Sequence, residues 1–273
     1  MDPTVAVFSR GTREISLSHP AKISCQRNDM KTDYLFAKYY YSRSEFVDGT
    51  TEFHKLIAAH VKAGNCLLEI GAGPQNETTN YLATLGPVVG ADISREVHDN
   101  VALSEAHTFD GIRLPFPDEI FDACVSNWVI EHLDNPSAHF REIRRVLKPG
   151  GVYCFRTPNR WHYFVLGSSL LPHSVHLRIA NRLRRIPKGG RDPYPTFYRA
   201  NTVACIRRFC SLVGLVPVEL LAIEKEPSYG RWHPVLFYPM MVYERLVNLC
   251  GPLRMFRGSL YGAVQKPTTT NAA

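Results

Sequence analysis

A short stretch that combines an acid with two glycines, Glu69-Ile70-Gly71-Ala72-Gly73, follows an apolar run and precedes a helical pattern. Glycine lets the backbone turn tightly and approach a ligand closely. Asp92 ends the next apolar run about 20 residues further on, a spacing that suits an acid accepting hydrogen bonds from ribose hydroxyls. These residues predict a site for a nucleotide-like cofactor. An ordinary turn between a strand and a helix is the alternative interpretation.

The elements that must position these residues alternate regularly between residues 60 and 160. Buried strands are predicted at 66–70, 88–92, 108–111, 121–127 and 152–155, and helices at 78–85, 94–103 and 138–147. This alternation is typical of an α/β fold with a doubly wound, mostly parallel sheet. Outside it we expect an N-terminal helical lid within 31–61, a helix at 201–213, a strand at 216–224, a helix at 237–249 and a last strand at 259–265.

The composition of the chain, 45% hydrophobic and 21% charged in 273 residues, indicates one large globular domain with an elaboration. We divide it into a flexible arm at 1–30, a cofactor-binding core with its lid at 31–160, and a substrate-region elaboration of the same domain at 161–266. No apolar run reaches the ~18 residues of a membrane span, and a secretory signal pattern is absent. Seven cysteines without a CxxC pair favour neither disulfides nor zinc, and no metal is expected.

The core segments resemble a known enzyme family. The stretches LLEIGAGP, ADIS and FDGIRLPFPDEIFDACVSNWVIEHLDNPSAHFREIRRVLKPGGVYCFRTPN resemble the class I S-adenosylmethionine-dependent methyltransferases, and within them the group that includes the ubiquinone-biosynthesis O-methyltransferases. The resemblance runs from about Leu67 to Asn159. It implies the Rossmann-like fold of that family, with S-adenosylmethionine as cofactor and S-adenosylhomocysteine as product.

The resemblance implies a role for each matching position. Gly71, Ala72 and Gly73 would line the methionine and ribose portions of the cofactor, with Glu69 beneath them, and Asp92 would bind the ribose hydroxyls. The other implied contacts are Ile93 against the adenine, Asp110 on its amino group with Gly111 alongside, and Ser126 and Asn127 towards the sulfonium and amino group.

One departure from the family pattern concerns Gln75, which stands where the family usually has a third glycine. Its side chain would either crowd the cofactor or add a hydrogen bond to it. On the other side of the predicted site, Arg43 is a candidate partner for the methionine carboxylate, and Tyr40 is a candidate substrate contact. A solvated arginine beside an aromatic core stripe is the alternative.

His132 is the candidate catalytic residue, because it comes just after the fourth predicted strand and imidazole titrates near neutral pH. A packing or capping role is the alternative, and we expect Glu131 to be structural. Arg160, Trp161 and His162 follow the fifth strand, at the edge where open α/β sheets bind ligands. With Tyr198 these are the candidate substrate contacts. More bases and aromatics follow at His173, His176, Arg178, Arg182, Arg184, Arg185, Lys188, Arg191, Tyr194, Phe197, Arg199, Tyr229, Arg231, Trp232 and His233.

These observations predict an enzyme that methylates a small molecule, with a hydroxyl oxygen as the expected acceptor. The candidate acceptors are a natural-product intermediate, a sugar or a lipid-linked quinone precursor. A nucleic-acid methyltransferase is supported only by the net charge of +7 and lacks a Pro-Cys pair, and a non-catalytic scaffold is supported only by Gln75. We expect a cytoplasmic protein and leave a peripheral membrane contact open, since bases and aromatics also suit anionic lipid. The sequence does not indicate an oligomeric state.

Overall fold

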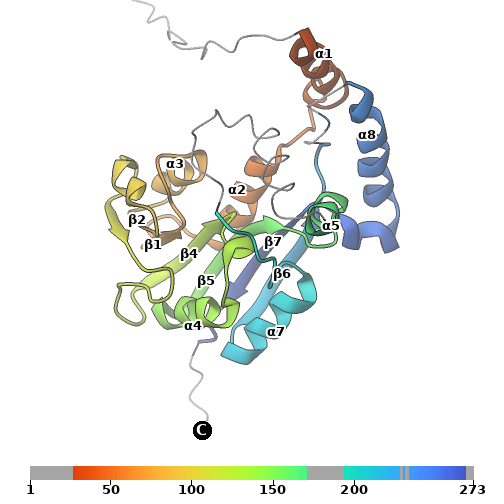
Figure 1. The fold of residues 1–273 in the computed structure, drawn as a ribbon. Helices are drawn as coiled ribbons and strands as arrows, with labels where there is room; N and C mark the ends of the chain where they lie inside the picture. Colours follow the sequence, from red (N-terminus) through yellow and green to blue (C-terminus); the bar gives the residue numbers. More distant parts are fainter. Residues whose placement is uncertain (1–26, 171–193, 228–229, 231–233, 269–273) are drawn as a thin grey trace, which may run out of the picture.

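A seven-stranded sheet in the order β3-β2-β1-β4-β5-β7-β6 forms the centre of the molecule (Figure 1). The structure is a computed structural model that describes residues 27–170, 194–227, 230 and 234–268. The strands are β1 (Leu67–Ile70), β2 (Val88–Asp92), β3 (Glu105–Thr108), β4 (Phe121–Asn127), β5 (Leu147–Pro158), β6 (Val216–Ile223) and β7 (Ser259–Gln265).

The first five strands run parallel, and β7 runs antiparallel to both β5 and β6. The predicted doubly wound, mostly parallel sheet is therefore confirmed. Strand β1 pairs with β2 on one side and with β4 on the other, so the strand order reverses at its carboxyl end. Open α/β sheets bind ligands at such a reversal point, and the glycine turn that follows β1 begins there.

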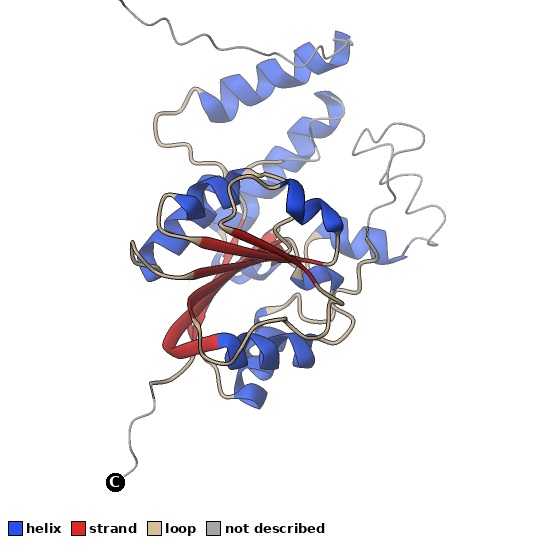
Figure 2. Cartoon of the chain, turned by 90° about the vertical axis from the view of Figure 1, so that its left-hand side faces the viewer, coloured by secondary structure: helices blue, strands red, loops and turns tan. Residues whose placement is uncertain are grey.

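Helices lie on both sides of the sheet, as Figure 2 shows. Their bounds are α1 (Arg27–Phe36), α2 (Gly49–His60), α3 (Glu77–Ala83), α4 (Pro136–Val146), α5 (Tyr163–Leu170), α7 (Val203–Val213) and α8 (Pro234–Leu249). Shorter turns of helix are η1 (Ala37–Tyr41), η2 (Arg95–Asp99), η3 (Ile130–His132) and η5 (Gly251–Phe256). One apolar cluster joins α4 and α7 to the sheet, and a second joins α2 and α3 to it.

Two of the predicted elements differ from the structure. The third strand ends at Thr108, before the predicted 108–111, because Asp110 accepts hydrogen bonds from the backbone of Ile112 and Arg113 and closes a turn there. The helix predicted at 94–103 is only the short η2. The last strand, in contrast, has the predicted bounds.

The N-terminal helices are divided between two places. Helix α2 covers the sheet, whereas α1 and η1 pack against α8 on one flank of the molecule (Figure 1). The two helices α1 and α8 meet through Phe36 and Phe237, whose ring centroids are 5.2 Å apart. The expected arm at 1–30 lies outside the described residues except for the start of α1. Residues 161–266 supply β6 and β7 to the same sheet as the core.

Candidate functional site

The glycine turn after β1 has the backbone conformation that its residue types predict. Gly71 and Gly73 have left-handed φ values of 71° and 50°. A Cβ atom at Gly71 would collide with the side chain of Val129, so this position also requires glycine for space. The Gly71 N–H donates to the Ala91 carbonyl at 2.8 Å, which ties the turn to the end of β2.

Two asparagines donate hydrogen bonds to the carbonyls of this turn, and neither was predicted from the sequence. The Asn76 side chain donates to the Ala72 carbonyl at 2.8 Å, and Asn100 donates to the carbonyls of Ala72 and Gly73 at 3.5 and 3.4 Å. Asn76 also caps α3 by accepting from the backbone of Thr78 and Thr79. Asparagine directly before a predicted helix is a common N-cap residue, so the capping role of Asn76 could have been predicted. No sequence pattern indicates a role for Asn100.

Asp92 is 8% exposed, and its carboxylate links the segments that follow β1 and β2. Its carboxylate accepts from the Gly73 N–H at 2.9 Å and from the Ser94 N–H at 2.7 Å. Ile93, next to it, is half exposed, and a Cβ at Gly111 would lie 3.1 Å from the Ile93 side chain. The residues predicted to bind ribose and adenine therefore follow one another along this edge.

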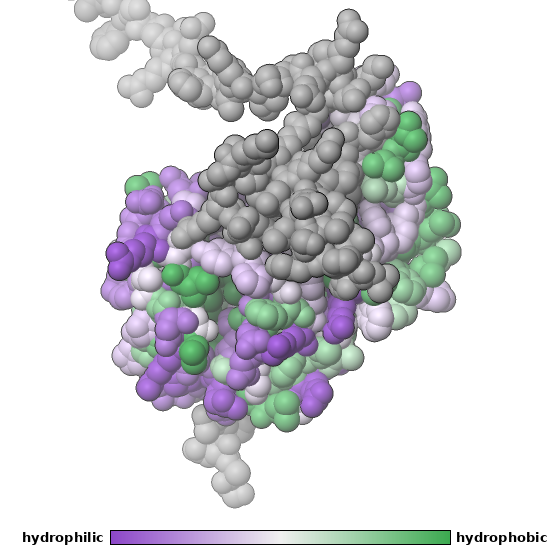
Figure 3. Space-filling view, in the orientation of Figure 1, coloured by the Kyte–Doolittle hydropathy of each residue, from purple (hydrophilic) through white to green (hydrophobic). Residues whose placement is uncertain are grey.

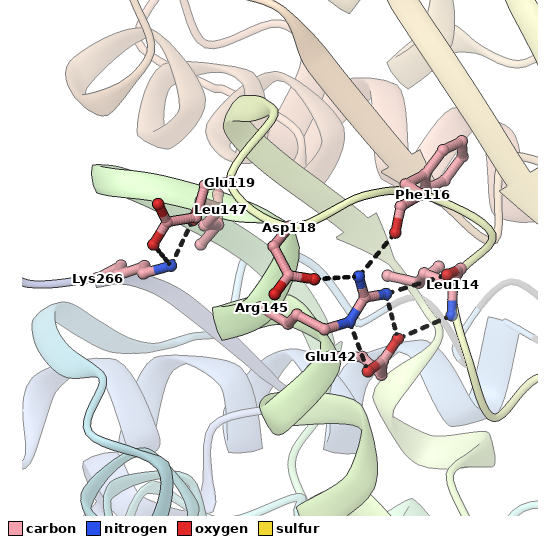
Figure 4. A network of polar contacts seen from close by, with 8 residues as sticks. All are labelled: Leu114, Phe116, Asp118, Glu119, Glu142, Arg145, Leu147 and Lys266. Carbon is pink, nitrogen blue, oxygen red and sulfur yellow. Dashed lines mark hydrogen bonds and ion pairs between the residues drawn. The ribbon is translucent and has the colours of Figure 1, made fainter.

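Asp110 is exposed at the same edge, and the backbone N–H groups of Arg113 and Ile112 lower its pKa. The loop that follows it is held by Arg145 of α4 (Figure 4). The Arg145 guanidinium makes a bidentate pair with Glu142 at 2.9 and 2.6 Å. It also donates to the carboxylate of Asp118 and to the carbonyls of Phe116 and Leu114. Three charge-assisted bonds from Arg145 thus fix the loop that follows Asp110 and Gly111, and two more hold the guanidinium against Glu142.

Glu69 lies under the glycine turn and is 2% exposed. Burial raises its pKa to about 7, partly offset by hydrogen bonds from Thr79 and Asn76. Its Oε2 is a buried oxygen with no hydrogen-bond partner. A buried carboxylate with one unpartnered oxygen suits a cationic ligand, and S-adenosylmethionine carries a sulfonium and an ammonium group. The residues present therefore fit this cofactor, with Glu69, the glycine turn, Asp92 and Asp110 as the groups that would hold it.

At the end of β4 the side chains of Ser126 and Asn127 point in different directions. Ser126 is fully buried, and its hydroxyl bonds to that of Tyr153 at 2.6 Å inside the sheet, so its side chain does not reach the edge. Asn127 reaches the edge, where it donates to Thr78 and accepts from Arg156 at 2.7 Å. The cofactor contact at the end of β4 stays a prediction for both residues.

Trp128 follows with a left-handed backbone, φ 61°, which is strained for a residue with a side chain. Its ring lies over the Arg156 guanidinium at 4.6 Å and is 39% exposed. Arg156 is itself 5% exposed and also faces the Phe53 ring at 5.6 Å. This cation–π stack fixes an aromatic surface beside Asn127. Neither Trp128 nor Arg156 was predicted from the sequence.

His132 lies in η3 with a defined tautomer. Its Nδ1 lies 2.8 Å from the Pro195 carbonyl, which can only accept, so the neutral ring carries its proton on Nδ1 and its lone pair on Nε2. Nε2 is 3.9 Å from the carboxylate of Glu131, which is buried and accepts from the Thr157 hydroxyl at 3.0 Å. The Glu131 carbonyl accepts from the backbone of Phe197 and Tyr198. The segment around 194–198 therefore lies against His132, which the sequence did not reveal.

Two candidate contacts are buried away from this edge. Tyr40 is 1% exposed between the rings of Phe36 and Phe237, and its hydroxyl donates to Glu244 at 3.0 Å. His162 is 4% exposed, 3.5 Å from Glu224, and burial lowers its pKa to about 4. Each completes an apolar or polar cluster beneath the surface, and its role as a substrate contact stays a prediction.

The other candidates are at the surface. Arg43 is exposed directly after η1, and Arg160 and Trp161 are exposed after β5. Tyr198 is partly exposed and has a left-handed φ of 51°. The Gln75 side chain is exposed and donates to Asn80 at 2.9 Å, so it turns towards α3 and does not crowd the glycine turn.

Several residues of the basic and aromatic segment lie outside the described part of the chain. They are His173, His176, Arg178, Arg182, Arg184, Arg185, Lys188, Arg191, Tyr229, Arg231, Trp232 and His233. None of the described helices is both long enough and apolar enough to cross a membrane.

Comparisons with known proteins bear on the family and the fold. Residues 68–155 match the family described as a methyltransferase domain. An uncharacterized methyltransferase of Schizosaccharomyces pombe is 32% identical over 112 residues, which are 35% of this chain and 40% of the relative. A demethylmenaquinone methyltransferase of Corynebacterium kroppenstedtii is 35% identical over 105 residues, 36% of this chain and 44% of the relative. The chain therefore spans less than half the length of these two relatives.

Among solved structures, an S-adenosylmethionine dependent methyltransferase from Mesorhizobium loti superposes with a TM-score of 0.51 at 15% identity. The match covers 80% of this chain and 98% of that one. This likeness concerns the fold, and the sheet is that of the class I methyltransferases. The narrower resemblance to ubiquinone-biosynthesis O-methyltransferases finds no support in these comparisons and stays a prediction.

Proposed function

We propose that this protein is an S-adenosylmethionine-dependent methyltransferase that acts on a small-molecule acceptor. The observation that carries the proposal is the buried Glu69, whose Oε2 lacks a partner directly beneath a glycine turn tied to Asp92. A carboxylate in this environment costs stability unless a cation compensates it. The match of residues 68–155 to the methyltransferase domain supports the same conclusion.

We further propose that the acceptor is a hydroxyl oxygen and that His132 is its general base. S-adenosylmethionine, when bound, supplies an electrophilic methyl group, so the chain has mainly to align the acceptor and accept its proton. The Pro195 carbonyl accepts from Nδ1 of His132, so in the neutral ring Nε2 is the basic nitrogen, which would take the hydroxyl proton as the new C–O bond forms. The buried Glu131 carboxylate, 3.9 Å away, stabilises the resulting imidazolium.

The exposed Trp128 ring and the segment that follows Tyr194 support an acceptor with a flat or apolar portion. The Tyr194 ring lies 6.1 Å from that of His132, and Trp128 is fixed by Arg156. Aromatic faces of this kind suit ring-shaped or lipid-like molecules. Arg160 and Trp161, exposed after β5, remain proposed contacts for the same molecule.

The first experiment is a calorimetric titration of the folded protein with S-adenosylmethionine and with S-adenosylhomocysteine. Saturable binding of one molecule per chain would support the cofactor assignment and justify a screen of hydroxylated acceptors with radiolabelled methyl donor. Absence of binding to a folded protein would refute it. Binding without transfer to any acceptor, nucleic acid included, would instead favour the non-catalytic scaffold.

A further inference from the structure

Helix α8 presents an apolar face to the outside of the molecule. Tyr238, Val242, Leu246 and Leu249 recur every three or four residues and so lie along one side of the helix. Their exposed fractions are 47, 52, 48 and 79%. Figure 3 shows apolar side chains gathering on the flank of the molecule on which Figure 1 shows α8. We call these four residues the outer face of α8.

The opposite side of the same helix packs against the rest of the molecule. It carries Phe237 and Val247, which are 0 and 2% exposed, and Glu244, which is 3% exposed. The Glu244 carboxylate accepts from the Tyr40 hydroxyl at 3.0 Å and from the Asn248 amide at 2.7 Å. A surface helix in water usually exposes polar residues, so the apolar outer face indicates surroundings other than bulk water.

The charges beside the outer face are of one sign. Between residues 234 and 257 the only acid is the buried Glu244, whereas the bases are Arg245, Arg254 and Arg257. Arg254 is exposed on η5 beside Met255, which is 50% exposed. Arg245 is partly exposed on α8 and pairs with Glu244 at 3.3 Å. The fully exposed charge on this segment is therefore the Arg254 guanidinium, next to an apolar surface that includes a tyrosine.

We propose that the outer face of α8, together with η5, docks on an anionic lipid surface. Aliphatic side chains enter the boundary of the acyl chains, tyrosine prefers the interface, and guanidinium groups reach the lipid phosphates. A second copy of the chain fits less well, because it would bring more arginines and no exposed acid from this segment to pair with them. The proposal does not depend on methyl transfer, and its test uses no cofactor.

The test is co-sedimentation of the full chain with vesicles of phosphatidylcholine alone or mixed 3:1 with phosphatidylglycerol. We expect the wild type to sediment with the mixed vesicles and the double variant Val242→Asp/Leu246→Asp to lose about tenfold or more in its partition coefficient. Leu212→Asp is the matched control, since Leu212 is 63% exposed on α7, and it should bind as the wild type does. Arg254→Gln should weaken binding to the mixed vesicles only.

Three results would overturn the proposal. The first is a wild type that stays in the supernatant with both kinds of vesicle. The second is a double variant that still binds, above all if neutralising Arg182, Arg184 and Arg185 abolishes binding instead. The third is a wild type that is a dimer in sedimentation velocity while the double variant is a monomer, because a second copy of the chain would then cover the outer face. Circular dichroism and thermal unfolding would verify that each variant is folded.

Discussion

Replacing Glu69 by glutamine should make the protein more stable at neutral and alkaline pH. The carboxyl has an ordinary pKa of 4.5, and burial raises it to about 7 in the folded protein. The folded state therefore holds this proton more tightly than the unfolded state, so wild-type stability falls as the pH rises from 4.5 through 7. At 1.36 kcal/mol for each pH unit, the loss reaches about 3 kcal/mol above pH 7, as an upper limit.

Glutamine has nearly the same shape and no titratable proton, so Glu69→Gln avoids this loss. The free energy of unfolding in urea should exceed that of the wild type by up to about 3 kcal/mol at pH 8 and should equal it near pH 4. The same change should weaken binding of S-adenosylmethionine, because it removes the buried negative charge. Wild-type affinity should rise by about tenfold between pH 6 and pH 8, as Glu69 ionises, and the variant should lack this rise.

Glu224 provides a matched control. It is also buried, burial raises its pKa to about 8, and its carboxylate accepts from the Gly258 N–H rather than facing the glycine turn. Glu224→Gln should show a similar gain of stability at alkaline pH with unchanged cofactor affinity. Equal stability of Glu69→Gln and the wild type at pH 8 would contradict a buried ionised Glu69, and the same pH dependence of cofactor binding in both would contradict its contact with the cofactor.

Substitutions at four further positions test other parts of the site. Asp92→Asn should weaken cofactor binding at least about tenfold in calorimetry, because one carboxylate serves both Gly73 and Ser94; unchanged affinity would contradict this. His132→Gln should lower kcat by about 10²- to 10⁴-fold and remove one limb of the pH–rate profile while leaving cofactor affinity unchanged, whereas a parallel loss of affinity would indicate a packing role. Trp128→Gly should have a free energy of unfolding about 1 kcal/mol higher than that of Trp128→Ala, since only glycine tolerates φ 61° without strain. Equal unfolding midpoints in denaturant would argue against strain. Arg145→Lys should lose about 1–3 kcal/mol of stability, because lysine cannot form the bidentate pair with Glu142, and a loss below about 0.5 kcal/mol would be evidence against the network.

The sheet was predictable because its strands are short, buried apolar runs. Residues 121–127 and 259–265 coincide with β4 and β7, and the helix at 201–213 ends as expected where Gly214 adopts φ 73°. Strand β3 was misplaced because it lies at the edge of the sheet and has the exposed ends Glu105 and Thr108, so no apolar run marks it.

The site was predictable only where one motif contains both the turn and its ligand-facing groups. The glycine turn and Asp92 are of this kind, since both follow strands that the sequence reveals. Arg156 and Asn100 are not, because each acts through partners far along the chain, such as Trp128 and the carbonyl of Ala72. Side-chain contacts over such separations follow from the fold and leave no local pattern.

Helix α8 shows a different limit. Its sequence is apolar almost throughout, so it predicts a helix without indicating which side faces inwards. The structure buries Phe237, Val247 and Glu244, and the Tyr40 hydroxyl of η1 satisfies the Glu244 carboxylate. The side that stays exposed carries Val242 and Leu246. The direction of such a face, and hence the kind of surface it meets, is a property of the assembled fold.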